Sequence, residues 1–221
     1  HLASPEDVRS SAAQVRRFEA ASAALLTAGL ALPTRHLAAS GGIFMRDPAW
    51  FDLVRPGLAC YGLLDDDLPV SPSAAESAAQ LRPAMSLKAR AAAFTDVPEG
   101  GTVGYGDRWR APRPSRIATL PVGYGDGYLR GTQPGAEVLV GGVRRPLVGV
   151  ISMDAMAVDV TDSPGLDHGH EFVLLGRQGS EHITAGELAR RRNTIAWEVL
   201  SSMAQRVDRV YYPEAGSAHQ D

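Results

Sequence analysis

Residues 102–128 read TVGYGDRWRAPRPSRIATLPVGYGDGY, a stretch with a Gly-Tyr-Gly turn on each side of an apolar run. The run Ile117–Val122 predicts a β-strand. The flanking glycines let the backbone beside Tyr105 and Tyr124 approach a ligand or another chain closely. A phenol can donate or accept a hydrogen bond, and it can transfer a proton when its pKa is lowered. One such turn alone favours a plain hairpin, whereas the second copy strengthens the case for functional tyrosines.

The residues around this stretch predict a mostly β region with one late helix. The short strand-like runs, separated by turn residues, are Met85–Phe94, Ile117–Val122, Ala136–Val140, Val143–Val148, Met156–Val160 and Glu171–Leu175. Between two of them, Gly141-Gly142 is a hairpin signal. Thr184 followed by Glu187 is a capping box, which predicts a helix running to about Arg192.

The first part of the chain alternates between helix and strand. Ser4-Pro5-Glu6-Asp7 predicts a helix start with Ser4 as the cap, and apolar residues at helical spacing continue to Leu25, before Gly29. The next predicted elements are a buried strand at Arg35–Ala39, a short helix near Ile43–Arg46 and an apolar run at Phe51–Leu63. This rhythm is typical of α/β folds, and an α/β barrel places its chemistry at the ends of its strands.

A composition change marks the boundary between these two regions. The segment Leu64–Ser77 is rich in Asp, Pro and Ser. We therefore expect the C-terminal portion of a TIM-type α/β barrel in residues 1–76 and a β-rich domain in residues 77–221. Within the second region, the residues from Pro213 onward have the character of a frayed tail.

Composition excludes several classes of protein. The 221 residues are 44% hydrophobic and 21% charged, as in ordinary globular proteins. A net charge of −3 without a basic block argues against nucleic acid or a membrane surface as a partner. The one cysteine, Cys60, excludes an internal disulfide and fits a reducing compartment, so we expect a cytoplasmic protein. No apolar run reaches membrane-spanning length.

Three positions at the ends of apolar runs are candidate binding residues. Ser40, before Gly41-Gly42, could offer a hydroxyl and backbone N–H groups to a phosphate, but as a single signal this pattern favours a plain turn. Arg55 lies inside an apolar run and needs a partner, either a ligand or a carboxylate in a strand-end salt bridge. Ser152-Met153-Asp154 closes another run and is either a site or a turn.

Two further patterns favour structural roles. His168 and His170, in Asp-His-Gly-His, have a spacing that could bind a metal ion, but no third ligand is evident, so we expect no metal site. Lys88 is the only lysine. It lies in a predicted strand, where we expect a solvated side chain.

Taken together, the chain resembles the alanine racemase family. The matching segments, in order, are HLAS, RHLAAS, VRPGLACYGL, LRPAMSLKARA, TVGYG, RIATLPVGYGDGY, VGVISMDAMAVDV, VLLGRQG, ITAGELA and NTIAWEVLSSMAQRVDRVY. They extend from His1 to about Tyr212. The resemblance implies an α/β barrel followed by a β domain, and a pyridoxal 5'-phosphate enzyme that interconverts L-alanine and D-alanine for peptidoglycan precursors. It also implies a homodimer with active sites shared between subunits.

The resemblance implies a role for each matching residue. Tyr105 matches one of two catalytic bases, on the L-alanine side, and projects into the site of the other subunit. Arg55 matches the arginine facing the cofactor's pyridine nitrogen, which a guanidinium leaves unprotonated. His1 matches the histidine between that arginine and the tyrosine. Met153 matches a substrate-carboxylate contact through its backbone N–H, and Tyr124 matches a tyrosine near the substrate entrance.

For the cofactor phosphate, the resemblance implies contacts from Ser40, Gly57 and Leu58, the last two through backbone. The family often has tyrosine where this chain has Trp197, whose indole N–H has a different reach, so phosphate binding is expected to differ in detail. Gly125 replaces the usual alanine, which we interpret as a minor change.

The family's Schiff-base lysine and an arginine that assists the substrate carboxylate match no residue here, and Lys88 matches a non-catalytic position. We therefore expect a C-terminal segment of a longer enzyme that binds the cofactor weakly and is inactive alone. The alternatives are a broad-specificity amino-acid racemase, a related decarboxylase, or a non-catalytic fragment that binds the cofactor or is only structural.

Overall fold

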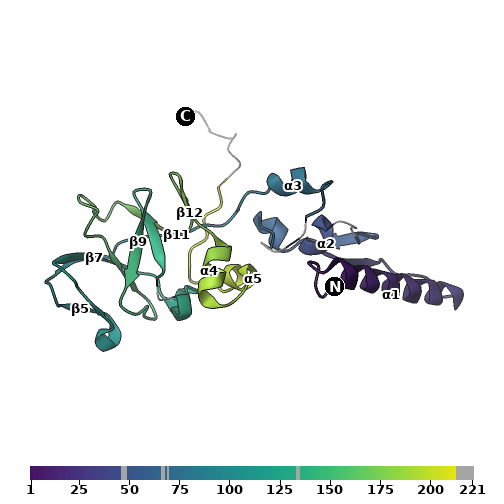
Figure 1. The fold of residues 1–221 in the computed structure, drawn as a ribbon, viewed down its shortest axis with the longest axis horizontal. Helices are drawn as coiled ribbons and strands as arrows, with labels where there is room; N and C mark the ends of the chain where they lie inside the picture. The colour runs from purple at the N-terminus through teal and green to yellow at the C-terminus, as the bar shows by residue number, and fades with distance from the viewer. Residues whose placement is uncertain (46–48, 66–67, 69, 133–134, 213–221) are drawn as a thin grey trace. The chain divides into compact units, whose positions relative to one another are not determined.

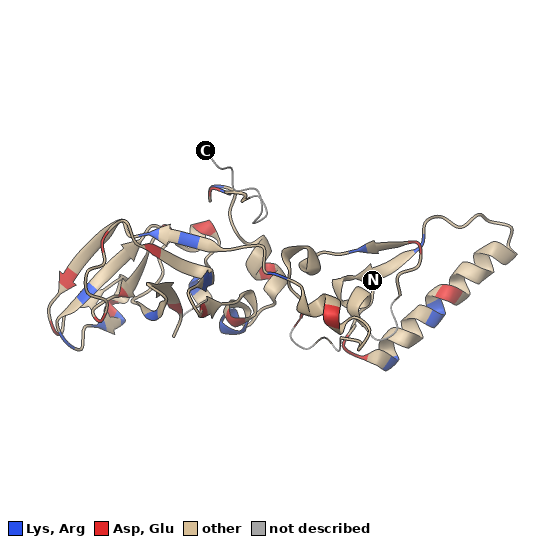
Figure 2. Cartoon of the chain, turned by 90° about the horizontal axis from the view of Figure 1, so that it is seen from above, with Lys and Arg blue, Asp and Glu red and all other residues tan. Residues whose placement is uncertain are grey.

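The computed structural model describes residues 1–45, 49–65, 68, 70–132 and 135–212. The chain divides into two compact units, His1–Ser86 and Leu87–Asp221 (Figure 1). The tail predicted from Pro213 and the predicted helix end at Arg46 lie outside the described residues. Within the described ranges, no helix is long and apolar enough to cross a membrane. Figure 2 shows Lys and Arg interspersed with Asp and Glu in both units.

The first unit contains two parallel strands and a long helix packed against them. Its elements are α1 (Val8–Thr27), β1 (His36–Ala39), α2 (Ser40–Phe44), β2 (Leu53–Arg55), the 3-10 helix η1 (Leu58–Tyr61) and α3 (Ala75–Ala79). Phe18 of α1 meets Phe51 edge to face at 5.0 Å, beside buried Leu37 of β1. In the strand pair, Ala39 lies opposite Arg55. Because the strands are parallel, the segments that follow them begin at the same edge.

The start of α1 differs from the predicted one. Ser4 was expected to cap the helix, but residues 4–7 form a turn in which Asp7 N–H donates to the Ser4 carbonyl. Asp7 is the cap: its carboxylate accepts the N–H groups of Arg9 at 3.0 Å and Ser10 at 3.1 Å. An extended Asp7 backbone makes this possible. At the other end, Gly29 follows the helix with a φ of +74°, as predicted.

Replacing Asp7 with alanine is expected to lower the free energy of unfolding by about 1 kcal/mol, because two N–H groups of the first turn lose their acceptor. The matched control is Ser4→Ala, which leaves the Ser4 carbonyl in place and is expected to change little. Chemical denaturation followed by far-ultraviolet circular dichroism measures both. A larger loss in Ser4→Ala than in Asp7→Ala would contradict the assigned cap.

The second unit is built on an antiparallel sheet. Its strands are β3 (Leu87–Arg90), β4 (Ala93–Val97), β5 (Thr102–Val103), β6 (Trp109–Arg110), β7 (Ser115–Leu120), β8 (Glu137–Val140), β9 (Val143–Val148), β10 (Met156–Asp159), β11 (Glu171–Gln178) and β12 (Glu181–Ile183). Seven follow the order β12-β11-β8-β9-β10-β7-β4, and β3 also pairs with β11. Strands β5 and β6 form a separate hairpin. The mostly β character predicted for this region is therefore confirmed.

The run Met85–Phe94, predicted as one strand, is two. β3 pairs with β11, while β4 pairs with β7 at the other end of the strand order. Only Ala91 and Ala92 separate them. Ala91 accepts a hydrogen bond from the His168 ring, and Ala92 N–H donates to Thr119. Because neighbouring residues pair with distant strands, the sheet must curl back on itself. Periodicity within a single run cannot reveal this change of partner.

Other local predictions are confirmed. Gly141 and Gly142, with φ of +60° and +76°, connect β8 to β9 as a two-residue turn. The helix α4 (Ala185–Arg192) begins at Thr184, whose hydroxyl accepts the Glu187 N–H at 2.9 Å. The Glu187 carboxylate pairs with Arg144 instead of completing the capping box. A further helix, α5 (Ala196–Ser201), was not predicted.

Candidate active site

Strand pairing brings the second Gly-Tyr-Gly turn against residues 149–155. In the antiparallel pair of β7 and β10, Leu120 lies opposite Met156. The loop that leaves β7 therefore meets the loop that enters β10. The first loop carries Tyr124, in the 3-10 helix η3 (Tyr124–Asp126), and the second carries Met153.

The two loops are joined backbone to backbone. Tyr124 N–H donates to the Ser152 carbonyl at 3.0 Å, and Gly125 N–H donates to the Met153 carbonyl at 2.8 Å. A Cβ on Gly123 would overlap both carbonyl groups. Gly123 must therefore be a glycine, because the backbone of residues 152–153 lies too close for a Cβ. The sequence led us to expect such a close approach to a ligand or another chain. In the structure the partner is a loop of the same chain.

The first Gly-Tyr-Gly turn meets the same loop from another side. It connects β5 to β6, with Tyr105 in the 3-10 helix η2 (Tyr105–Asp107). Gly104 has a φ of +79°, and a Cβ there would lie 3.0 Å from Val150 N. A Cβ on Gly149 would lie 2.5 Å from the Val103 carbonyl oxygen. Tyr105 itself is 73% exposed, so its phenol is accessible in this unit.

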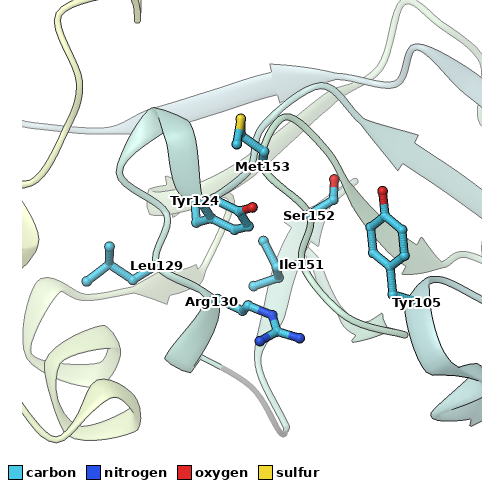
Figure 3. A pocket seen from close by; sticks show the side chains of 7 residues that line it. All are labelled: Tyr105, Tyr124, Leu129, Arg130, Ile151, Ser152 and Met153. Carbon is cyan, nitrogen blue, oxygen red and sulfur yellow. The ribbon is translucent and has the colours of Figure 1, made fainter.

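These three segments form an open pocket of about 700 Å³. Figure 3 shows Tyr105 and Tyr124 on opposite sides of the Ile151–Met153 segment. The lining residues are Tyr105, Tyr124, Leu129, Arg130, Ile151, Ser152 and Met153. Sequence reasoning missed Arg130. Its only local signal was a cation two residues after the GYGDGY motif, and the pocket position of its side chain requires tertiary structure.

The Ser152–Asp154 segment is a turn that also lines this pocket. Ser152 Oγ accepts the Ala155 N–H at 3.0 Å and donates to the Ala155 carbonyl at 2.9 Å. Met153 is exposed, and among the described residues nothing accepts a hydrogen bond from its N–H. Asp154, which was given no chemical role, binds Arg206 at 2.7 Å. Hydrogen bonds to Asp154, which has the larger effect, and to Asp126 raise the pKa of the Arg206 guanidinium.

In the first unit, a second cluster lies where β1 and β2 end. Ser40 is buried, and its Oγ accepts the N–H groups of Gly57 and Ala59, each at 3.0 Å. Leu58, between them, is buried in η1. This arrangement brings together Ser40, Gly57 and Leu58, the three residues expected near a phosphate. Because Ser40 Oγ accepts the N–H groups of Gly57 and Ala59, the donors left here for an anion are the Ser40 hydroxyl hydrogen and the Leu58 N–H.

Arg55 lies beside the same cluster. Its guanidinium donates to Nδ1 of His36 across the parallel strand pair, which requires the imidazole nitrogen to be an unprotonated acceptor. Among the described residues, the partner of Arg55 is thus an imidazole and not the carboxylate of a strand-end salt bridge. His36 was assigned no role from the sequence. His1 is exposed, and its carbonyl accepts from Gln14, so its expected link to Arg55 stays a prediction.

The remaining candidates lie in the second unit. Trp197 is in α5 and partly exposed. Lys88, in β3, pairs with Glu171 at 2.9 Å on the surface, as expected of a solvated strand lysine. His168 bonds the Ala91 carbonyl, and His170 bonds Asp167 at 2.8 Å. No three His, Cys, Asp or Glu side chains in the described part of the chain are grouped to hold a metal ion.

The two units of the chain match known protein domains, which define its class. Both units match domains of one type of two-domain enzyme: residues 1–65 match the model "Alanine racemase, N-terminal domain" and residues 84–211 match "Alanine racemase, C-terminal domain". The chain belongs to the alanine racemase family. The recognition made from the sequence is thereby confirmed.

Individual relatives support this assignment. Alanine racemase of Symbiobacterium thermophilum is 42% identical over 198 residues, covering 90% of this chain and 51% of the relative. The solved alanine racemase of Streptomyces coelicolor is 36% identical with a TM-score of 0.86, covering 97% and 55%. That of Bacillus anthracis with bound L-Ala-P is 31% identical with a TM-score of 0.86, covering 97% and 54%. The chain spans about half the length of these relatives.

Proposed function

We propose that this chain is the C-terminal part of an alanine racemase that interconverts L-alanine and D-alanine with pyridoxal 5'-phosphate. The observation that carries the proposal is the exposed phenol of Tyr105 on a turn braced against the loop that carries Met153. A catalytic base must be accessible to its substrate and held firmly. The exposed phenol and the braced backbone of its turn support this role in a member of this family. The product D-alanine would supply peptidoglycan precursors in the cytoplasm.

Within this proposal, Tyr105 removes or returns the α-proton of alanine on its L side through its phenol oxygen. Tyr124 and the Met153 N–H bind the substrate, the latter by donating to its carboxylate. Arg130 adds positive charge to the pocket, which attracts the carboxylate of the substrate. The opposite face of the carbon requires a second base, which we assign to the part of the enzyme that corresponds to the upstream half of its relatives.

The donor groups of the first unit suit pyridoxal phosphate. Ser40 and Leu58 would hold its phosphate through the Ser40 hydroxyl hydrogen and the Leu58 N–H, and the Gly57 N–H would contact it only by leaving Ser40 Oγ. Trp197 would replace the tyrosine contact usual in the family. Arg55 would donate to the ring nitrogen, with His36 fixing the guanidinium plane. When bound, the cofactor delocalises the negative charge that proton removal leaves on the α-carbon. A guanidinium does not protonate the ring nitrogen, which moderates this effect and disfavours side reactions.

We further propose a homodimer with shared sites. The candidate base lies in the second unit, on a hairpin tip, while the candidate cofactor residues lie in the first unit. The family resemblance implies that Tyr105 serves the partner subunit's cofactor, with His1 linking it to Arg55. The C-terminal portion of an α/β barrel in residues 1–76 and a β domain in residues 77–221 remain our proposed division.

The proposal is tested by joining this chain to the upstream half of a related alanine racemase and measuring interconversion of alanine enantiomers by circular dichroism. We expect turnover of alanine well above that of serine, leucine and lysine. Comparable turnover of all four would favour the broad-specificity alternative, and release of carbon dioxide a decarboxylase. Cofactor absorbance without turnover would favour a non-catalytic binding protein.

A further inference from the structure

Arg206 connects the two loops of the pocket in the second unit. Its Nε lies 2.7 Å from Asp126 Oδ1, and its Nη2 lies 2.7 Å from Asp154 Oδ1. Asp126 follows Tyr124 in η3, and Asp154 follows Met153. One planar guanidinium therefore bridges the segment that carries Tyr124 and the segment that carries Met153. Its fork of donors allows both bonds at once, which an ammonium group cannot reproduce in the same geometry.

Asp126, the more buried of the two partners of Arg206, also bonds to the backbone of the Tyr124 turn. Asp126 is largely buried, and its second oxygen, Oδ2, accepts the Gly123 N–H at 2.8 Å. The Asp126 carbonyl also accepts the Ala204 N–H at 3.0 Å, which joins the turn to the segment carrying Arg206. The Asp126 carboxylate therefore links the Arg206 guanidinium to the backbone N–H of Gly123, the residue before Tyr124.

Because Gly125 has no side chain, the Arg206 guanidinium can lie against its backbone. A Cβ at this position would lie 2.5 Å from Arg206 Nη2 and 3.0 Å from the Met153 carbonyl oxygen. The glycine that stands where the family usually has alanine lies beside this guanidinium, and the expectation that the change is minor stays a prediction. With alanine at this position the guanidinium would have to shift.

We propose that Arg206 is a positioning residue for substrate binding: by bridging Asp126 and Asp154 it sets the separation of Tyr124 and Met153 across the pocket. This inference rests on the proposed function, because it assigns both residues to the substrate. Arg206 does not line the pocket. The Tyr105 turn is braced by Gly149 and Val150 instead. Loss of Arg206 therefore loosens substrate binding more than proton transfer.

The kinetic test uses the joined enzyme described above. Arg206→Ala is expected to raise KM for alanine about tenfold and to change kcat less than about threefold, because two charge-assisted hydrogen bonds are lost away from the base. The matched control is Arg113→Ala, since the Arg113–Asp162 pair has similar exposure, 53% and 63% against 50% and 67% for Arg206 and Asp154. A KM for Arg206→Ala equal to that of the control, or a loss confined to kcat, overturns the proposal.

A second measurement needs no turnover. In the chain itself, amide hydrogen exchange of residues 123–125 is expected to accelerate in Arg206→Ala and not in Arg113→Ala. If Arg206→Ala impairs folding, Asp154→Ala takes its place; it removes only the exposed half of the bridge and should give a smaller acceleration. Unchanged exchange in both variants overturns the proposal. An unmodified enzyme without alanine turnover would instead count against the proposed function, and exchange would still decide the role of Arg206.

Discussion

Tyr105→Phe in the joined enzyme is expected to lower kcat for L-alanine about 10³-fold, because the variant loses the group that accepts the α-proton. The turn should persist, since Gly104 and Gly106, with φ of +79° and +72°, are unchanged and the ring retains its shape. Racemisation followed by circular dichroism measures the loss. Removal of a single oxygen atom makes this the largest effect on activity that we expect from one substitution.

Deuterium exchange distinguishes a lost base from a damaged pocket. In deuterated water, Tyr105→Phe should abolish α-proton exchange of L-alanine while D-alanine still exchanges, since the second base remains. Tyr124→Phe is the matched control: the same atom is removed from the facing tyrosine, and exchange of both enantiomers should persist with a higher KM. If Tyr105→Phe slows α-proton exchange of L-alanine and D-alanine equally, Tyr105 is not the base specific to the L side.

Gly123→Ala is expected to reduce the free energy of unfolding by about 3 kcal/mol, at the upper end of the cost of overpacking, and to lower Tm by about 6–12 °C. The added Cβ would overlap the carbonyl groups of Ser152 and Met153, which are backbone and cannot rotate aside as a side chain can. The two loops would have to separate, which breaks the hydrogen bonds from Tyr124 and Gly125.

Calorimetry on the chain measures this change, with Gly131→Ala as the control. A Cβ on Gly131 would have no neighbour within 4 Å, so its Tm should remain close to that of the unmodified chain. If Gly123→Ala unfolds at the same temperature as Gly131→Ala, the close packing of the two loops is not a significant source of stability.

Local sequence signals predicted the elements well where the cause is local. Gly141-Gly142 predicted its turn because two consecutive residues with positive φ favour glycine. Thr184 predicted the start of α4 because a hydroxyl next to a helix can accept an N–H group. The cap of α1 was misplaced by three residues because Ser4 and Asp7 are both good caps, and the turn between them decides which one is used.

The candidate site was predicted only in part, because local signals reveal a residue's type and neighbours but not its distant partners. The motifs identified Tyr105, Tyr124, Ser40 and Arg55, whose residue types and neighbours are informative on their own. They gave no indication of His36, Arg130 or Arg206. These three are ordinary polar residues until a strand pair, a pocket and a bridge bring them to their partners.

By itself, the sequence determined which family this chain belongs to, which residue types at its motifs are able to transfer a proton or donate to an anion, and where paired glycines allow a tight turn. These properties are carried by single residues and their immediate neighbours. Only the tertiary structure decided that both Gly-Tyr-Gly turns meet residues 149–153, and that one strand-like run supplies both β3 and β4. The physical reason is that strand pairing and loop packing join residues distant in the chain, and local patterns do not encode their register.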